Sequence, residues 1–230
     1  MKIGLIADVH GNYVALKAVW NAIANETDSV FFLGDLCGYY PFVEECASVW
    51  DAARVIGIRG NHDQIICDCL ESGTKSDPSY KVKYGSALDR TLQDLDSTTR
   101  SMVEAWPASR SLSMNHTHFS LFHGAPWEPL QGRVYPDFEA WEQFADVPGD
   151  VIVLGHTHYP LVKQYKDKLI INPGSVGQPR DRSSSASYAI INTGSGRVQH
   201  HRISFDPRAI IEDASEFDPT LPYLVEVLTR

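Results

Sequence analysis

The sequence predicts a mixed α/β protein with two β-sheets, the first largely parallel and the second mostly antiparallel. In the first part of the chain, short apolar strands alternate with helical stretches, a pattern typical of parallel βαβ units. After Trp106, short β-type runs separated by turn residues follow one another. The chain has 230 residues, 43% of them hydrophobic and 21% charged, and can bury a core without disulfides. We therefore expect residues 1–230 to form a single domain.

The first part of the chain is expected to contain three strands, each followed by a helical stretch. The strands are at 2–7, 29–33 and 54–58. The helical stretches are at 13–24, 43–53 and 64–106. The last of these is interrupted by a polar segment at 73–79, and Asp96 or Ser97 is a suitable N-cap for its second part. Ligands of parallel sheets bind beyond the carboxyl ends of the strands, so the residues after these strands are candidates for a site.

The second part of the chain is expected to be rich in strands. They are predicted at 111–115, 118–122, 151–154, 161–165, 169–172, 188–192 and 197–204. Residues 137–145 have a helical pattern, and short helices are expected after Asp206 and Pro219. The serine-rich segment 181–187 is predicted to be a mobile loop.

Charge and cysteine usage exclude several classes of protein. The formal charge of −9 argues against a nonspecific nucleic-acid binder with a broad basic face, although phosphates can still be held through metal ions. The four cysteines have neither a disulfide framework nor zinc-ribbon spacing. No apolar run is long enough to span a membrane, and the N-terminus resembles a core strand more than a signal peptide. We therefore expect a cytoplasmic protein that does not bind membranes.

Polar side chains that can bind metals follow five of the predicted strands. They are Asp8, His10, Asp35, Asn61, His62, His123, His156 and His158. Each cluster alone could be an ordinary turn, with a surface histidine or an N-capping residue. Together they would bring two carboxylates, an amide and several imidazoles to one edge of the sheets. Such a mixed set suits manganese, iron, zinc or nickel better than calcium.

The ordered motifs DVH, GD, GNHD, HG and GHTH resemble the signature of the calcineurin-like metallophosphoesterase superfamily. They extend from Asp8 to His158. The stretches GYYP, FHGAPWEP and NPGSVGQPRD further resemble a small prokaryotic, phosphodiesterase-like branch of that superfamily. The resemblance implies two packed mixed β-sheets flanked by helices, in a four-layer α/β/β/α sandwich.

The resemblance also implies two divalent metal ions and assigns a ligand set to each. Asp8, His10 and His158 would bind the first ion. Asn61, His123 and His156 would bind the second, and Asp35 would bridge the two. Strand alternation alone would put His156 and His158 on one face, which favours a shared metal. The resemblance instead assigns them to different metals.

His62 resembles the catalytic histidine of the family, which contacts the phosphate and can protonate the leaving alkoxide. The alternative is that His62 only caps the following helix. Asp63 fits an acidic residue in the first turn of that helix better than a catalytic partner. Protein phosphatases of the superfamily continue the GD motif as GDxxDRG, whereas this chain has GDLCGYYP. Gly38 thus takes the place of the second aspartate, which argues against a protein phosphatase.

The expected substrate contacts are Asn12, Tyr39, Tyr40 and Arg180. Tyr39, Tyr40 or Trp127 could stack on a nucleobase or simply pack against a loop. Arg180 and Arg182 could hold a second phosphate or be solvated loop residues.

The predicted function is a dinuclear-metal-dependent phosphoesterase acting on a small phosphodiester or phosphorylated nucleotide. The alternatives are a metal-dependent nuclease, which would need a basic track to the site, and a non-enzymatic metal-binding scaffold with the same fold. The sequence leaves open whether the protein forms a homo-oligomer.

Overall fold

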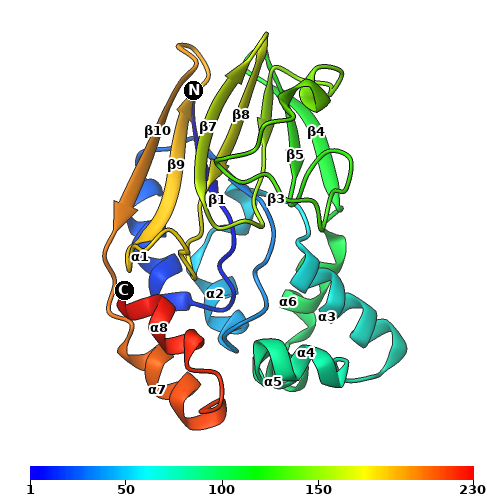
Figure 1. Ribbon diagram of the computed structural model, residues 1–230, viewed down its shortest axis with the longest axis vertical. Helices are drawn as coiled ribbons and strands as arrows, with labels where there is room; N and C mark the ends of the chain where they lie inside the picture. Colours follow the sequence, from blue (N-terminus) through cyan, green and yellow to red (C-terminus); the bar gives the residue numbers. More distant parts are fainter.

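Two five-stranded β-sheets pack against each other, and the α-helices lie beside the first sheet and at the lower end of the molecule (Figure 1). The structure is a computed structural model that describes all residues from Met1 to Arg230. The strand order is β10-β9-β1-β2-β3 in one sheet and β4-β5-β6-β8-β7 in the other. The predicted pair of packed mixed sheets with flanking helices is confirmed. No helix is both long and apolar enough to cross a membrane.

The first sheet combines strands from the two ends of the chain. Its strands are β1 (Lys2–Ile6), β2 (Ser29–Phe32), β3 (Val55–Gly57), β9 (Ala186–Asn192) and β10 (Arg197–Ile203). The pairs β1–β2 and β2–β3 are parallel, whereas β1–β9 and β9–β10 are antiparallel. The prediction of a largely parallel sheet was wrong, because a hairpin from the end of the chain adds beside β1.

The second sheet is also evenly mixed. Its strands are β4 (Ser109–Met114), β5 (Thr117–Phe122), β6 (Val151–Val153), β7 (Pro160–Tyr165) and β8 (Lys168–Pro173). The outer pairs β4–β5 and β7–β8 are antiparallel hairpins. The central pairs β5–β6 and β6–β8 are parallel, so the prediction of a mostly antiparallel sheet was wrong. Each hairpin adds to the sheet through only one of its strands, and β6 lies between the two hairpins.

The helices pack mainly on the outer face of the first sheet, which shares a hydrophobic core with them. They are α1 (Tyr13–Ile23), α2 (Val43–Val49), η1 (Ala52–Arg54), α3 (Asn61–Ser72), α4 (Pro78–Tyr84), α5 (Ala87–Asp94) and α6 (Ser97–Ala105). The predicted cap is confirmed, since the carboxylate of Asp96 accepts a hydrogen bond from the amide of Thr99 at 2.7 Å. At the end of the chain, α7 (Arg208–Phe217) and α8 (Tyr223–Thr229) lie across from α4 and α5 at the lower end of the molecule (Figure 1).

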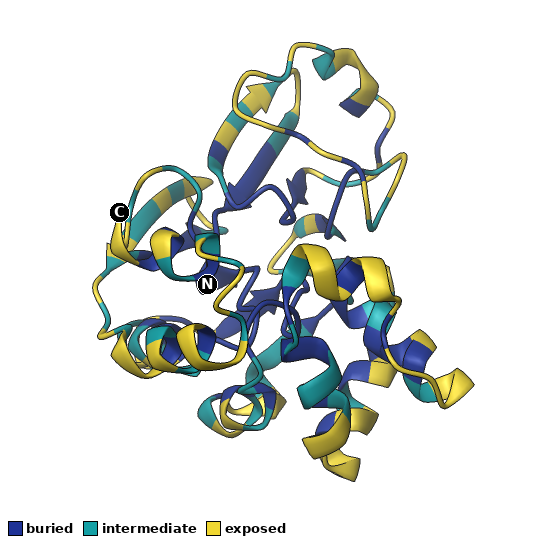
Figure 2. Cartoon of the chain, turned by 60° about the horizontal axis from the view of Figure 1, so that its bottom comes forward, coloured by how far each residue is buried: buried dark blue, intermediate teal, exposed yellow.

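The two sheets share a second core made of apolar side chains from their facing surfaces. In β1, Ile3 and Leu5 belong to this core, whereas Ile6 packs under the helices. Phe31 meets Phe119 of the other sheet edge to face, with 5.1 Å between the ring centroids. Buried residues accordingly lie along the strands and the inner faces of the helices, and the outer helix faces are exposed (Figure 2).

The outer face of the second sheet is covered mainly by a long loop and not by α-helices. Only Trp141–Phe144 forms a short 3₁₀ helix, η2, so the predicted helix at 137–145 was wrong. Aromatic residues at helical spacing in this segment instead pack on the sheet as a small separate core. Trp127 belongs to this aromatic cover, stacked on Phe138 with 5.8 Å between ring centroids.

Candidate metal centre

The metal-binding candidates lie in sharp turns just beyond the carboxyl ends of the strands. Asp8, His10, Asp35, His156 and His158 all have positive φ, between 51° and 65°. Non-glycine residues seldom adopt this conformation, and it concentrates at functional sites. His156 and His158 follow β6 and do not lie on it, so the alternation of a strand does not govern where their side chains point.

The first cluster contains Asp8, His10 and His158, all buried. The Nε2 atoms of His10 and His158 face each other at 3.1 Å. Nε2 of His158 is 3.7 Å from Oδ1 of Asp8. The other oxygen of Asp8, Oδ2, is buried and has no hydrogen-bond partner.

The second cluster contains Asp35, His123 and His156, with Asn61 beside them. Nε2 of His123 lies 3.2 Å from Oδ2 of Asp35 and 3.0 Å from Oδ1 of Asn61. Nε2 of His10, in the first cluster, is 3.7 Å from the same oxygen of Asp35. Asp35 therefore lies between the two clusters.

The hydrogen bonds of three imidazoles suit metal ligation. Nδ1 of His10, His158 and His123 donates to the backbone carbonyls of Cys37, Gln178 and Leu33, at 2.9, 2.6 and 2.7 Å. Because a carbonyl can only accept, each Nδ1 carries a proton, and a ring that is neutral presents its lone pair at Nε2. Fixing the ring through its other nitrogen is the usual arrangement around metal-bound histidines.

The charge balance of the clusters also fits cations. Burial lowers the pKa of His10 and of His158 well below the ordinary value, so both rings are neutral and their facing Nε2 lone pairs repel. Burial disfavours a charged His123 as well, but the carboxylate of Asp35 raises the pKa of His123 to about 9. The facing lone pairs and the unpartnered Oδ2 of Asp8 are the features that a divalent ion would satisfy.

Asp63 holds the turn that carries Asp35. Its carboxylate accepts hydrogen bonds from the amides of Asp35, Cys37 and Gly60, at 2.8, 3.0 and 3.0 Å. This agrees with its interpretation as an acidic residue in the first turn of α3. Gly60 must be glycine, because a Cβ there would be 2.1 Å from Oδ1 of Asp35.

His62 lies beside both clusters, at the floor of a pocket. Its amide donates to Oδ1 of Asp35 at 2.9 Å, and its ring meets that of His10 edge-on with 5.1 Å between centroids. Nδ1 of the ring is hydrogen-bonded to the hydroxyl of Tyr80, a residue in α4. Because Nδ1 is bonded to Tyr80, Nε2 is the ring nitrogen that can contact a ligand in the pocket.

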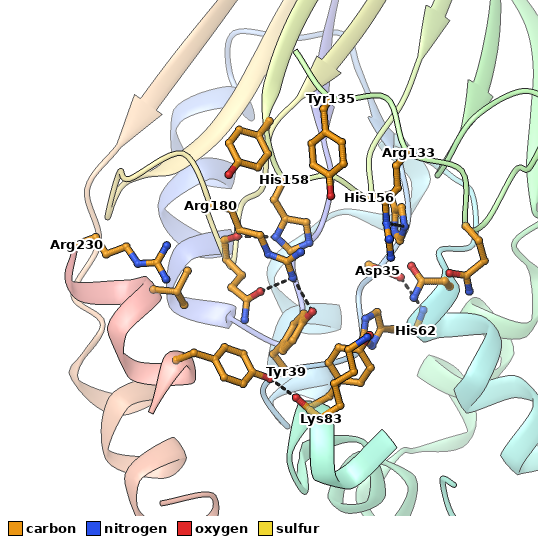
Figure 3. Close-up of a pocket in the computed structure, with 17 residues that line it drawn as sticks. Asp35, Tyr39, His62, Lys83, Arg133, Tyr135, His156, His158, Arg180 and Arg230 are labelled. Atoms are coloured by element: carbon orange, nitrogen blue, oxygen red, sulfur yellow. Dashed lines mark hydrogen bonds between the residues drawn. The ribbon is translucent and has the colours of Figure 1, made fainter. Parts of the chain in front are cut away.

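The pocket has a volume of about 570 Å³ and is open above the clusters (Figure 3). Arg180 lies beside His158 and donates to the hydroxyl of Tyr39 at 2.6 Å and to the side chain of Gln178 at 2.9 Å. On the other side, Nε of Arg133 is 3.3 Å from Nε2 of His156. Tyr39 and Arg180, two of the four residues predicted to contact the substrate, therefore line the pocket.

Two predicted substrate contacts do not reach the pocket. Asn12 is fully buried, with its oxygen accepting from the amide of Ala15 as the N-cap of α1 and its amide donating to the carbonyl of Gly177. Tyr40 is also fully buried, and its hydroxyl donates to the carbonyl of Leu224 at 2.8 Å. Both predictions were wrong, because these side chains hold the loops together. Trp127 and Arg182 also lie outside the pocket.

Several pocket residues were not predicted from the sequence. They are Lys83, Tyr84, Gln131, Arg133, Tyr135, Tyr159, Gln178, Tyr223, Val227 and Arg230. They come from α4, α8 and connecting segments, and only Gln178, in NPGSVGQPRD, lies in a stretch singled out from the sequence. An excess of basic and tyrosine residues in these segments is the only signal that could have drawn attention to them.

Comparison with known proteins identifies the family. Residues 1–196 match the calcineurin-like phosphoesterase superfamily domain. The chain belongs to this superfamily. Membership makes it a metal-dependent phosphoester hydrolase, as predicted.

Relatives of this calcineurin-like phosphoesterase resemble it over nearly its whole length. The uncharacterized protein MJ0912 of Methanocaldococcus jannaschii is 30% identical over 230 aligned positions, covering 91% of this chain and 90% of the relative. The crystal structure of a metallophosphoesterase from Sphaerobacter thermophilus has a TM-score of 0.81 at 28% identity, covering 100% and 99% of the two chains. The hypothetical protein PH1004 of Pyrococcus horikoshii has a TM-score of 0.82 at 22% identity, covering 99% and 97%, and shows the shared fold.

Proposed function

We propose that this phosphoesterase uses two divalent metal ions to hydrolyse a small phosphodiester or phosphorylated nucleotide. The observation that carries the proposal is the pair of ligand clusters on either side of Asp35, at the floor of one pocket. Asp8, His10 and His158 would hold the first ion, and Asn61, His123 and His156 the second. The carboxylate of Asp35 offers two anionic oxygens and would bridge them. Manganese, iron, zinc and nickel all suit this donor set.

Ions held by these residues would supply positive charge for the phosphoryl oxygens and would lower the pKa of bound water toward neutral. The chain's own residues orient the substrate and manage the leaving group. His62 faces the pocket through Nε2, where it can donate a proton to the leaving oxygen. Neutral ligands such as imidazole and the amide of Asn61 leave most of the positive charge available to the phosphate.

The charges in the pocket favour a substrate with more than one anionic group. Four cationic residues line it, namely Lys83, Arg133, Arg180 and Arg230, and Asp35 is the only acidic residue among its lining. The whole chain shows the opposite balance, with 20 Lys and Arg against 29 Asp and Glu. Arginine and lysine beside a metal centre suit phosphate groups. Five tyrosines also line the pocket and could contact an aromatic base.

The size of the pocket also favours a small molecule. A volume of about 570 Å³ lies within the usual range of roughly 300–1,000 Å³ for small-molecule sites. A long polyanion would be repelled by the net charge of −9 once it extended beyond the pocket. We therefore prefer a phosphodiester or nucleotide substrate to a nucleic acid.

The experiment is a substrate panel with the chelated and reconstituted protein. Manganese, iron, zinc and nickel are each added back, and bis-p-nitrophenyl phosphate, p-nitrophenyl phosphate, diadenosine tetraphosphate and a single-stranded oligonucleotide are compared. We expect metal-dependent turnover of at least one small ester and no cleavage of the oligonucleotide. Turnover of the oligonucleotide alone would favour a nuclease, and no turnover with any of the four metals would contradict the proposal.

Arg180 is expected to bind the second anionic group of the substrate. Arg180→Gln should lower kcat/KM for diadenosine tetraphosphate about tenfold or more, because a hydrogen bond to a charged group contributes about 1.5–3 kcal/mol. The effect should appear mainly in KM and should be smaller for p-nitrophenyl phosphate. Arg182→Gln is the matched control, since Arg182 is exposed and lies outside the pocket. An equal loss in the two variants would contradict the assignment.

A further inference from the structure

The Nδ1 atom of His62 has one hydrogen-bond partner, the hydroxyl of Tyr80. Both residues are buried, with 4% and 6% of their surface exposed. The hydroxyl of Tyr80 makes no other hydrogen bond, so the contact is exclusive on both sides. The two residues are 18 positions apart in the chain, in α3 and α4.

Gly38 explains why a tyrosine and not a nearby carboxylate contacts this nitrogen. Gly38 has a φ of +140°, in the region that favours glycine. A Cβ at this position would be 2.5 Å from Nδ1 of His10 and 3.2 Å from Nδ1 of His62. The backbone of the GDLCG turn therefore lies directly against both rings. An aspartate side chain at position 38 has no room beside His62.

We infer that Tyr80 is the positioning residue of His62, fixing its ring and its tautomer so that Nε2–H points into the substrate pocket. The inference deepens the proposed phosphoesterase function and rests on it. It assigns a role to α4, a helix outside all the metal-binding motifs. Tyr80 is neither a proposed metal ligand nor a residue that lines the pocket, and its hydroxyl reaches the site only through His62.

A phenol hydroxyl suits a partner of His62 because it can hydrogen-bond to both the neutral and the protonated imidazole. Burial raises the pKa of Tyr80 well above its ordinary value, so the hydroxyl keeps its proton. Beside a neutral imidazole the hydroxyl donates to Nδ1, which leaves the ring proton on Nε2. Beside an imidazolium the hydroxyl oxygen accepts from Nδ1–H.

The contact also persists through the proton transfer. When the imidazolium gives its Nε2 proton to the leaving oxygen, the N–H bond breaks, an O–H bond forms, and the ring is left with its one proton on Nδ1, which donates to Tyr80. Exchange with solvent, with one proton gained at Nε2 and one lost from Nδ1, then restores the resting Nε2–H tautomer. Unlike a carboxylate, the hydroxyl carries no charge that would favour the imidazolium over the neutral ring.

The aromatic surroundings keep the ring of Tyr80 in place without its hydroxyl. The rings of Tyr39, Tyr80 and Tyr84 surround that of His62, with centroids 5.2, 5.5 and 5.1 Å away. Helix α4 begins at a cap by Asp77, whose carboxylate accepts from the amide of Ser79 at 2.8 Å. Tyr80→Phe therefore removes one hydrogen bond and keeps the packing.

The kinetic test compares two esters that differ in leaving group. Bis-p-nitrophenyl phosphate needs little protonation of its leaving oxygen, whereas diphenyl phosphate needs more. Tyr80→Phe should lower kcat for diphenyl phosphate about five- to tenfold, with KM unchanged, and less than about twofold for the nitrophenyl ester. The control is Tyr188→Phe, which removes the hydroxyl of a buried tyrosine on β9, outside the pocket. Equal losses with both esters would overturn the inference.

A double-mutant cycle separates action through His62 from a general structural effect. In a His62→Ala background, Tyr80→Phe should cost nothing further, because the residue through which it acts is gone. A similar loss in both backgrounds would assign Tyr80 a purely structural role and overturn the inference.

An independent test uses ¹⁵N NMR of the His62 ring in the zinc-reconstituted protein. We expect the Nε2–H tautomer in the wild type and a mixture of tautomers in Tyr80→Phe. A mixture in the wild type would overturn the inference even if the protein turns over esters. An inactive wild type that nevertheless holds the Nε2–H tautomer would contradict the proposed function and leave the positioning role supported.

Discussion

Replacing His62 with alanine is expected to lower kcat by about 10²- to 10⁴-fold, the usual contribution of a positioned general acid. The residue lies at the pocket floor with Nδ1 occupied by Tyr80, so its Nε2 is directed to the substrate. It belongs to neither proposed ligand set. The metal content of His62→Ala, measured by mass spectrometry after reconstitution, should therefore stay at two ions per chain.

The matched control for this prediction is His118→Ala. His118 is exposed on β5 and lies outside the pocket and the clusters, so this variant should retain wild-type kcat. Wild-type kcat in His62→Ala would contradict a role in catalysis. Loss of one metal in His62→Ala would instead indicate that His62 is a ligand.

The second large effect is expected from Asp35→Asn. Oδ2 of Asp35 lies 3.2 Å from Nε2 of His123 and 3.7 Å from Nε2 of His10, which puts one carboxylate within reach of both clusters. An amide has a single oxygen and no charge, so it is a poor bridge between two cations. We expect the variant to bind at most one ion per chain. Losing the contribution of one metal, several kcal/mol, should lower turnover on the order of 10³-fold or more.

Asp150→Asn makes the same chemical change away from the site and serves as the control. Its carboxylate accepts a hydrogen bond from the amide of His118 at 2.8 Å, and it lies outside both clusters. This variant should keep its metals and its turnover. Two bound ions together with normal turnover in Asp35→Asn would show that Asp35 does not bridge the metals.

The candidate ligands could be predicted from sequence because their signals are local. Each follows an apolar strand, and two stand next to glycines that the turns need: Gly34 has a φ of +89°, and a side chain on Gly60 would collide with Asp35. The carboxyl ends of parallel strands meet at one edge, so finding the strands was enough to predict that these residues gather there. The division of the residues between two metals came only from the family resemblance. Strand boundaries agree with the structure to within a few residues.

Features that depend on distant partners could not be predicted. The position of β9 beside β1 joins segments more than 180 residues apart and adds two antiparallel strands to a sheet that was expected to be largely parallel. The spacing of Phe138 and Trp141 suits a helix, but their contacts with the sheet favour an irregular cover. Tyr40 resembles a surface aromatic beside a motif, yet α8 buries it completely.

The surroundings of His62 could not be predicted from the sequence for the same reason. Gly38 showed that the second aspartate of GDxxDRG is missing, but nothing in the sequence indicated which side chain would contact Nδ1 of His62. Tyr80 has no motif of its own, and only the packing of α4 against α3 brings it to His62. Lys83 and Tyr223 likewise reach the pocket from different helices, joined where the Tyr223 hydroxyl donates to the carbonyl of Lys83 at 2.8 Å.

The proposed dinuclear centre is tested most directly by anomalous diffraction from crystals of the manganese-reconstituted protein, recorded at the manganese absorption edge. We predict two peaks about 3.5–4 Å apart, the separation found in two-metal hydrolases, with the carboxylate of Asp35 between them. His158 should contact one peak and His156 the other. A single peak shared by His156 and His158, or two peaks without Asp35 between them, would contradict this account.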